Sequence, residues 1–354
     1  MEISIYISEI MSCADPYLEA EINARLDDLT KPPGSLGRLE DLVTHYCLCR
    51  GSAAAEISRK KIFTFAGDHG ITSEGVTVYP SEVTVQMVLN MAAGGAAVSV
   101  LSKNADIDYS VVDIGTKGDF SGISGVLDRK AGSGTKSFLH DNAMTAEECE
   151  RAVSLGAELG STEEADIFGI GEMGIGNTSS AAALYSLLLD VDPFETAGAG
   201  TGMTGDKLDH KRKVISLAVD FHKKSWDGRP FDALCRVGGF EIAGMCGFII
   251  GAASKRIPVV IDGFISSVSA LCAMKYCPDV RDYCIFSHRS SEKFHKDFLK
   301  SMNIEPVLDL GMRLGEGTGS ALAIQIICQA MNCYHQMATF SSAGVSNKEE
   351  DQDA

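Results

Sequence analysis

The chain has 354 residues, of which 45% are hydrophobic and 22% are charged. A chain of this length and composition can bury a large core, which excludes a disordered tail or a minimal scaffold. The formal net charge of −17 disfavours nucleic acids and anionic membrane surfaces as partners, because both are polyanions. No apolar stretch reaches the roughly 20 residues that span a bilayer, so we predict no membrane span.

The N-terminal residues and the cysteines both favour a cytoplasmic protein. Residues 1–10 carry Glu2 and Glu9 in place of a basic region followed by an apolar run, so no secretory signal is predicted. The 11 cysteines lie in apolar contexts, and Cys47 and Cys49 lack the two-residue spacer of a zinc or redox pair. We therefore expect buried thiols.

The predicted elements alternate along the chain. Residues 14–50 favour helices that are broken by the turn of residues 31–37, KPPGSLG. Short β-branched or aromatic runs then alternate with segments whose apolar residues have helical spacing. The predicted strands are 61–66, 109–113, 166–170, 258–262 and 283–286, and the predicted helices include 81–101, 178–189 and 320–337. This alternation predicts an α/β fold with a parallel sheet covered on both faces, because parallel strands need crossover connections.

Polar and glycine-rich segments follow three of the predicted strands. They are Gly67-Asp68-His69-Gly70, Gly171-Glu172-Met173-Gly174 and Asp262-Gly263. Ligands of parallel sheets bind at the carboxyl ends of the strands, so we expect one composite site there. The last residues, 341–354, are polar and acidic, which predicts a disordered tail.

The first glycine cluster, residues 171–176, lies between a predicted strand and a predicted helix that begins with Asn177, Thr178 and Ser179. Unpaired backbone N–H groups and hydroxyls at a helix start favour a phosphate or a carboxylate. An ordinary capped turn is the alternative, since Asn, Thr and Ser cap many helices. The segment is not a P-loop, because no Gly-Lys-[Ser/Thr] follows.

The second glycine cluster, residues 198–205, leads into the densest basic stretch of the chain, residues 206–213. Its glycine spacing does not fit the dinucleotide fingerprint, so NAD binding is not predicted. A basic run is often a solvated helix face. One of these side chains is nevertheless a candidate to neutralise an anion held by the first cluster.

The third cluster, residues 308–320, places Glu316 between two glycines at the head of a predicted helix. A carboxylate held on such a turn suits a general base, and burial against Met312 and Leu314 would raise its pKa toward neutrality. The alternative is a carboxylate that only interacts with the helix dipole. Glu172 has the same two interpretations.

A metal site is not predicted. His69 in Gly67-Asp68-His69-Gly70 is a possible ligand together with Asp68, but no other histidine has ligand spacing near it.

Taken in chain order, these segments resemble the nicotinate-nucleotide:dimethylbenzimidazole phosphoribosyltransferases of cobalamin lower-ligand synthesis. The segments that carry the resemblance are residues 31–37 (KPPGSLG), 66–70 (AGDHG), 74–80 (EGVTVYP), 82–87 (EVTVQM), 171–180, 198–205, 238–243 (GGFEIA), 287–290 (SHRS) and 314–319 (LGEGTG). They cover nearly the whole chain.

The resemblance implies a transferase that needs neither a metal nor a cofactor. The phosphoribosyl group of nicotinate mononucleotide would move to a nitrogen of 5,6-dimethylbenzimidazole or a related base, with inversion at the anomeric carbon. Glu316 matches the general base of the family. An enzyme that uses adenine or a phenol as acceptor, and a non-catalytic binder of nucleotides or azoles, are the alternatives.

The resemblance also assigns substrate-binding residues. The phosphate would lie on Gly176, Asn177, Thr178 and Ser179, with Lys213 as counter-charge and Gly202 nearby. The aromatic base pocket would be lined by Gln86, Leu314 and Gly315, and the same cleft would contain Glu172, Gly174, Glu241 and Asp262. The family is dimeric with shared active sites, and Ser290 stands where a loop would close such a site.

The fold implied by the resemblance has two parts. A large Rossmann-like domain with a mostly parallel sheet would span residues 50–300, and a smaller helical domain would combine residues 1–49 and 301–354. Thr77, Val78 and Tyr79 depart from the residues that family members often carry, which leaves the identity of the accepted base open.

Overall fold

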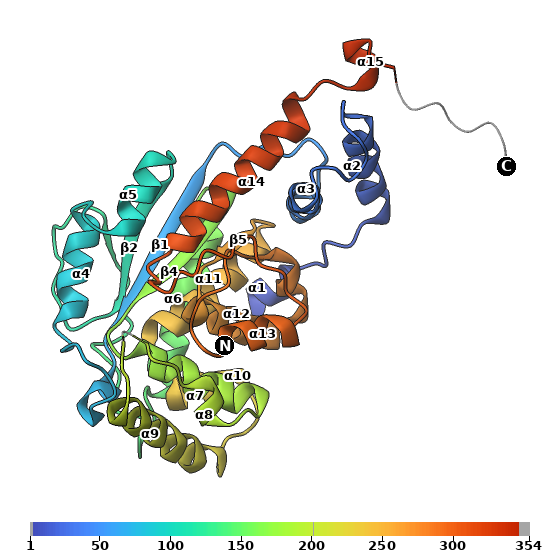
Figure 1. Cartoon of the computed structure of the whole chain (residues 1–354). Coiled ribbons are helices and arrows are strands. Elements are labelled where there is room, and N and C mark those ends of the chain that lie inside the picture. The colour runs from blue at the N-terminus through green and yellow to red at the C-terminus, as the bar shows by residue number, and fades with distance from the viewer. Residues whose placement is uncertain (1–2, 201, 347–354) are drawn as a thin grey trace.

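The computed structural model describes residues 3–200 and 202–346, and its centre is a six-stranded parallel sheet (Figure 1). The strand order is β3-β2-β1-β4-β5-β6, and every neighbouring pair is parallel. The strands are β1 (Lys60–Gly67), β2 (Asp108–Gly115), β3 (Val126–Asp128), β4 (Ile167–Met173), β5 (Val259–Ile261) and β6 (Cys284–Phe286). The predicted α/β fold with a parallel sheet is confirmed, and β3 was not among the predicted strands.

Helices cover both faces of this sheet. Their bounds are α1 (Ile3–Glu9), α2 (Pro16–Asp28), α3 (Arg38–Arg50), α4 (Val83–Ala92), α5 (Ala97–Asn104), α6 (Ala146–Thr162), α7 (Asn177–Leu189), α8 (Pro193–Thr196), α9 (Asp206–Lys223), α10 (Pro230–Val237), α11 (Phe240–Ser254), α12 (Phe264–Tyr276), α13 (His295–Ser301), α14 (Thr318–Gln336) and α15 (Phe340–Ala343), with short 3₁₀ turns η1 (Gly70–Glu74) and η2 (Pro278–Tyr283).

Side chains of β1 alternate between two hydrophobic cores. Phe63 and Phe65 enter the core shared with α6, α7, α11 and α12. Ile62 and Ala66 enter the opposite core, which is shared with α3, α4 and α14. A strand that is buried on both faces needs apolar residues at successive positions, and the predicted run of residues 61–66 has this pattern.

The helices from the two ends of the chain lie together, and Figure 1 shows α14 running along the sheet toward α2 and α3. Ile22, Leu42 and Tyr334 of these helices belong to the same core as Ile62 of β1. The end helices therefore share one continuous core with a face of the sheet. Of the predicted disordered tail, residues 341–346 are described and include part of the capped helix α15, whereas 347–354 lie outside the described residues.

The predicted helix 81–101 is two helices. Within the described residues, the segment Val83–Asn104 is the one with the length and apolar character of a membrane span. The chain turns between α4 and α5, with Gly94 in the left-handed region. Helices of 10 and 8 residues rise about 15 and 12 Å, far short of a 30 Å hydrocarbon layer. The apolar residues of α4 and α5 therefore cover the sheet.

The connections on the two sides of the sheet centre determine where a ligand can bind. From β1 the chain passes to β2 and β3 on one side, and from β4 to β5 and β6 on the other. The connections that follow β1 and β4 therefore lead to opposite sides, which leaves a crevice at the carboxyl ends of these strands. Glycine-rich segments follow both strands, as predicted for one composite site.

Candidate active site

Glu316 lies on an unusual turn at the start of α14. Three successive residues, Gly315, Glu316 and Gly317, have φ values of 82°, 66° and 99°. The glycines adopt this left-handed conformation freely, but for Glu316 it costs on the order of 1 kcal/mol. The Thr64 hydroxyl of β1 donates to the Glu316 carbonyl over 2.6 Å, and this bond helps to hold the turn.

Strand β4 approaches this turn very closely at Gly171. A Cβ atom on Gly171 would lie 2.1 Å from the Gly317 nitrogen and 2.2 Å from the Glu316 carbonyl carbon. No real side chain fits at such distances. The predicted glycine cluster after β4 therefore serves in part to bring the turn of Glu316 against the sheet.

The Glu316 carboxylate is well placed to accept a proton. The residue is 5% exposed, and its Oε2 atom is buried without a hydrogen-bond partner. Burial, with a smaller contribution from the negative charge of Asp262, raises the pKa of Glu316 to about 6, against the opposing effect of a backbone hydrogen bond from Val98. The group is thus ionised at neutral pH yet holds a proton more strongly than an exposed glutamate.

A cavity of about 450 Å³ opens beside this carboxylate. One wall is apolar and comes from Tyr79, Val83 and Met87 on and before α4. The other lining residues include Glu172, Gly174, Asn177, Thr178, Ser290, Leu314, Gly315 and Glu316, all of them predicted site residues. A flat apolar ring fits the first wall, and a polar ligand fits the second.

The start of α7 lies at the edge of this cavity, where Asn177 and Thr178 line it. Gly176 is the N-cap, with a φ of 98° and no side-chain cap. The N–H groups of Asn177 and Ser179 donate to the carbonyls of Gly174 and Gly176, so the positive end of the helix dipole, rather than a set of free N–H groups, favours an anion here. Thr178 Oγ1 accepts a hydrogen bond from Lys211 Nζ over 2.8 Å. The buried hydroxyl of Ser179 has no partner. These groups favour a phosphate.

The lysine at this site is Lys211, not the predicted Lys213. Lys211 is 1% exposed, and burial lowers its pKa to about 8, against the opposing charge of Glu292. The Lys213 side chain, two residues further along α9, is exposed. Two helical positions differ by about 200°, so only one of the two lysines can face α7. The geometry therefore favours Lys211 over the predicted Lys213 as the counter-charge.

The glycine that lines the cavity also differs from the predicted one. Gly200, rather than Gly202, lines the cavity. A Cβ atom on Gly200 would lie 2.9 Å from Thr178 Oγ1 and 3.0 Å from Lys211 Nζ. The Arg313 side chain donates to the Gly200 carbonyl over 3.2 Å, which joins this loop to the one that carries Glu316. Sequence reasoning did not select Gly200, Lys211 or Arg313 as site residues.

Three further predicted carboxylates are buried behind the cavity or on its wall. Glu172 lines it, and burial together with the charges of Asp262 and Glu241 raises its pKa well above the ordinary value. The Asn177 amide donates to Glu172. Glu241 lies deeper, and its Oε1 atom is 2.6 Å from His69 Nε2. Neither Glu241 nor Asp262 lines the cavity.

His69 connects this cluster to α7. Its Nδ1 atom is 3.0 Å from the Ser180 hydroxyl, and its Nε2 atom faces Glu241. Within the described part of the chain, no group of three His, Cys, Asp or Glu side chains is arranged to hold a metal ion. The two hydrogen bonds make His69 a structural link between α11 and the start of α7.

Two other predicted residues have different surroundings from those expected. Gln86 is exposed on α4 and does not line the cavity, where Val83 and Met87 stand instead. Ser290 lines the cavity of its own chain, and its backbone N–H donates to His295 Nδ1 over 2.8 Å.

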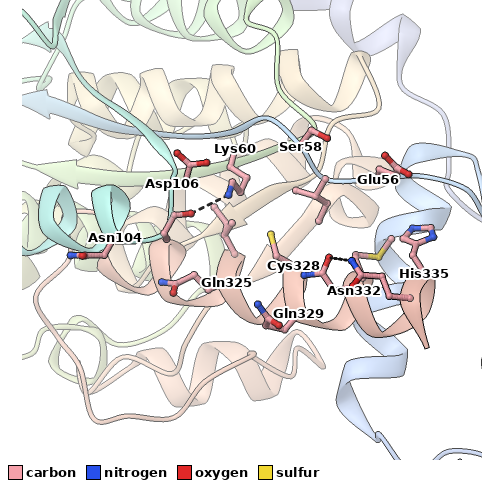
Figure 2. A pocket seen from close by; sticks show the side chains of 15 residues that line it. Glu56, Ser58, Lys60, Asn104, Asp106, Gln325, Cys328, Gln329, Asn332 and His335 are labelled. Atoms are coloured by element: carbon pink, nitrogen blue, oxygen red, sulfur yellow. Dashed lines mark hydrogen bonds between the residues drawn. The ribbon is translucent and has the colours of Figure 1, made fainter. Parts of the chain in front are cut away.

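A second hollow, of about 570 Å³, lies at the opposite end of the sheet (Figure 2). Gln325, Gln329 and Asn332 of α14 point into it, and Lys60 at the start of β1 donates to the Ala105 carbonyl over 3.0 Å. Among residues 3–200 and 202–346, no buried polar atom without a partner belongs to its lining. This hollow offers hydrogen bonds but no buried reactive group.

Comparisons with known proteins agree with this geometry. A family model described as a phosphoribosyltransferase matches residues 11–345. A nicotinate-nucleotide–dimethylbenzimidazole phosphoribosyltransferase of Chlorobaculum parvum is 47% identical over 337 residues, which cover 94% of this chain and 95% of that protein. The protein of the same name from Pelodictyon phaeoclathratiforme is 48% identical over 328 residues, 92% of each chain.

The fold also matches a solved structure. The crystal structure of CobT from Thermus thermophilus has a TM-score of 0.89 and 38% identity, and the match covers 94% of this chain and 100% of that one. Identity at this level over nearly the full length of both chains, together with the match of the family model, leaves one assignment. The chain belongs to the nicotinate-nucleotide–dimethylbenzimidazole phosphoribosyltransferase family.

Proposed function

We propose that the protein transfers the 5-phosphoribosyl group of nicotinate mononucleotide to a ring nitrogen of 5,6-dimethylbenzimidazole. The products are α-ribazole 5′-phosphate and nicotinate, with inversion at the anomeric carbon. The observation that carries this proposal is the buried, unpartnered Glu316 carboxylate beside a cavity with one apolar wall and one anion site. The names of the relatives support the choice of substrates.

The start of α7 holds the phosphate in this proposal. The positive end of the α7 dipole, the Thr178 hydroxyl and the Lys211 ammonium together favour an oxyanion there. Binding the 5′-phosphate there fixes the ribose with its anomeric carbon toward the cavity. Orientation of this kind can supply several kcal/mol of the acceleration, because it removes the entropy of bringing two reactants together.

The acceptor lies against Tyr79, Val83 and Met87, with its N–H toward Glu316. Glu316 takes that proton as the other ring nitrogen attacks the anomeric carbon from the face opposite the nicotinate. The C–N bond to nicotinate breaks, and its electron pair neutralises the pyridinium ring. Because a pyridinium is already a good leaving group, the protein need not protonate it, and the main chemical task is proton removal from the acceptor.

A direct assay tests this function. The protein is incubated with nicotinate mononucleotide and, separately, with 5,6-dimethylbenzimidazole, adenine and a phenol as acceptors. Release of nicotinate is followed by chromatography, and each product is identified by mass. We expect the benzimidazole to be the best acceptor; binding of both ligands without release of nicotinate would contradict the transferase.

A matched pair of variants tests the base. We expect Glu316→Gln to lower kcat by about 10² to 10⁴-fold, the usual contribution of a general base. Glu56→Gln makes the same chemical change at the second hollow and should leave kcat unchanged. A Glu316→Gln protein with full turnover would remove the assignment of the base.

We also propose that the protein is a cytoplasmic homodimer whose second copy covers the cavity opening. Val78, Tyr79 and Leu314 are large apolar side chains that are 45%, 49% and 57% exposed beside the cavity. Exposed apolar residues that cluster at one place favour a protein contact. Light scattering should give a mass near twice that of the chain, and a Leu314→Asp, Val78→Asp protein should be monomeric.

A further inference from the structure

Asp262 lies at the end of β5 and holds the main chain next to Glu316. Its side chain is buried, its Oδ2 atom accepts from the Gly317 N–H over 2.9 Å, and its Oδ1 atom accepts from the Gly319 N–H over 2.7 Å. Asp262 does not line the cavity. Its carboxylate instead caps the first turn of α14 and fixes the turn on which Glu316 stands.

His288 follows β6 and is the imidazole nearest to this carboxylate. Its Nε2 atom lies 3.5 Å from Asp262 Oδ1, and the residue is 1% exposed. Neither ring nitrogen has a hydrogen-bond partner within the described structure. A buried imidazole without a partner is costly, and an adjustment of a few tenths of an ångström would let Nε2 donate to Asp262.

Gly319 makes this arrangement possible. A Cβ atom on Gly319 would lie 2.3 Å from His288 Cδ2 and 2.6 Å from Asp262 Oδ1. The absence of a side chain in the first turn of α14 thus lets the imidazole and the carboxylate approach the helix start together.

Other titratable groups surround these residues. His295 of α13 meets His288 edge to face, with ring centroids 6.4 Å apart, and its own pKa is lowered to about 3, by burial first and by His288 second. The charge of Asp262 raises the pKa of both Glu316 and Glu172. The charge of Glu241 on α11 also raises the pKa of Glu172. The Tyr109 hydroxyl on β2 donates to the Thr64 hydroxyl, which donates to the Glu316 carbonyl. Of these groups, His288 is the one with a ring nitrogen 3.5 Å from the Asp262 carboxylate.

We propose that Asp262 and His288 are a positioning pair for Glu316: His288 donates from Nε2 to the Asp262 carboxylate, which in turn holds the main chain that follows Glu316. The pair acts through the turn and touches neither substrate. This inference rests on the proposed function, in which Glu316 is the base.

The pair should affect kcat rather than substrate binding. We expect His288→Ala to lower kcat about 10 to 100-fold with little change in the KM for nicotinate mononucleotide, because Thr178 and Lys211 do not contact the pair. His288→Gln keeps an N–H donor at a similar reach and should restore most of kcat. If His288→Ala does not fold, the His288→Gln protein should still have a kcat within about fivefold of the wild type, and a kcat as low as that of Glu316→Gln would contradict the inference.

Asp262→Asn adds a readout that a purely structural role would not change. Loss of the negative charge removes one cause of the raised pKa of Glu316, so the acid limb of the kcat/KM profile should move to lower pH. The inference is wrong if that limb stays in place, or if His288→Ala leaves kcat within twofold of the wild type while Glu316→Gln is inactive. If Glu316→Gln itself keeps full turnover, the proposed function fails instead.

Discussion

Two of the hollows in the described structure lie at opposite ends of the same sheet and share the same helix, yet only one of these two has the groups that a reaction needs. The helix α14 begins at the cavity that contains Glu316 and ends beside the hollow lined by Gln329 and Asn332 (Figure 2). The hollow at the amino ends of the strands is the larger, about 570 Å³ against about 450 Å³. Volume therefore does not identify the site.

The difference lies in burial and in backbone conformation. At the carboxyl ends, Glu172 and Glu316 are buried close together and the turn carries three left-handed residues in succession. At the amino ends, Lys60 is bonded to a main-chain carbonyl, and Gln329 and Asn332 are exposed amides. Buried charge and a conformation that costs free energy persist together where a function keeps them. At the larger hollow the left-handed non-glycine residue is Asp106, with a φ of 52°, and it is exposed.

The strongest test of the comparison is a pair of lysine variants on α9. We expect Lys211→Met to raise the KM for nicotinate mononucleotide about 10 to 100-fold, because a charged hydrogen bond to phosphate contributes about 1.5–3 kcal/mol. Lys213→Met should change it less than twofold. If Lys213→Met raised this KM more than Lys211→Met did, Lys213 would be the counter-charge. The proposed phosphate site beside the cavity would then be wrong.

The pH profile sharpens the same comparison. Glu316 must be ionised to accept a proton, and its pKa is raised to about 6; Lys211 must be charged, and its pKa is lowered to about 8. We expect kcat/KM to be bell-shaped, to fall about tenfold per pH unit below 6, and to fall again above 8. The Lys211→Met protein should lose the basic limb and keep the acid one.

Ionisation of Glu316 is expected to have a smaller effect on the stability of the fold, and the sign of this effect follows from the raised pKa. The pKa of Glu316 is higher in the folded protein than in an unfolded chain, so ionisation at this position destabilises the fold. This cost begins near pH 4.5 and is complete above pH 6. We expect the free energy of unfolding of Glu316→Gln, relative to that of the wild type, to rise by about 1–2 kcal/mol between pH 4.5 and pH 7.5. Urea unfolding at the two pH values measures this difference. An unchanged difference between the two proteins at these pH values would argue against a buried, ionised Glu316.

The smallest effects are expected at the amino-end hollow. Gln329→Ala and Asn332→Ala remove exposed amides from α14 and should change kcat/KM less than twofold. A larger change, measured in the same assay, would show that the two ends of α14 are coupled. It would contradict the view that only the carboxyl-end cavity contributes to the reaction.

The sequence predicted the central parts of the fold because they carry strong local patterns. The β-branched and aromatic runs that became β1, β2 and β4 are largely buried, and the predicted glycine-containing segments lie at the carboxyl ends of β1, β4 and β5. The strand β3 was missed because a pairing of three residues at the sheet edge, Val126–Asp128, has no comparable pattern. The break between α4 and α5 was missed because both halves have the same apolar spacing.

The site was less predictable where it depends on packing. Lys211 and Lys213 are the same residue type in the same basic stretch, and only the contact of α9 with α7 distinguishes them. Asp262 was expected among the groups of the cleft, but hydrogen bonds to the start of α14 place it behind the cavity. These contacts join residues that are 33, 55 and 57 positions apart, and one sequence holds no local trace of them.

The order of the elements along the chain has a consequence for synthesis. The turn that cradles an anion follows β4, whereas the proposed base follows the last strand and depends on α14 docking across the sheet. A ribosome therefore completes the turn that follows β4 long before it completes the segment that carries Glu316. Glu316 can reach its place against Gly171 only when the final layer of the fold closes.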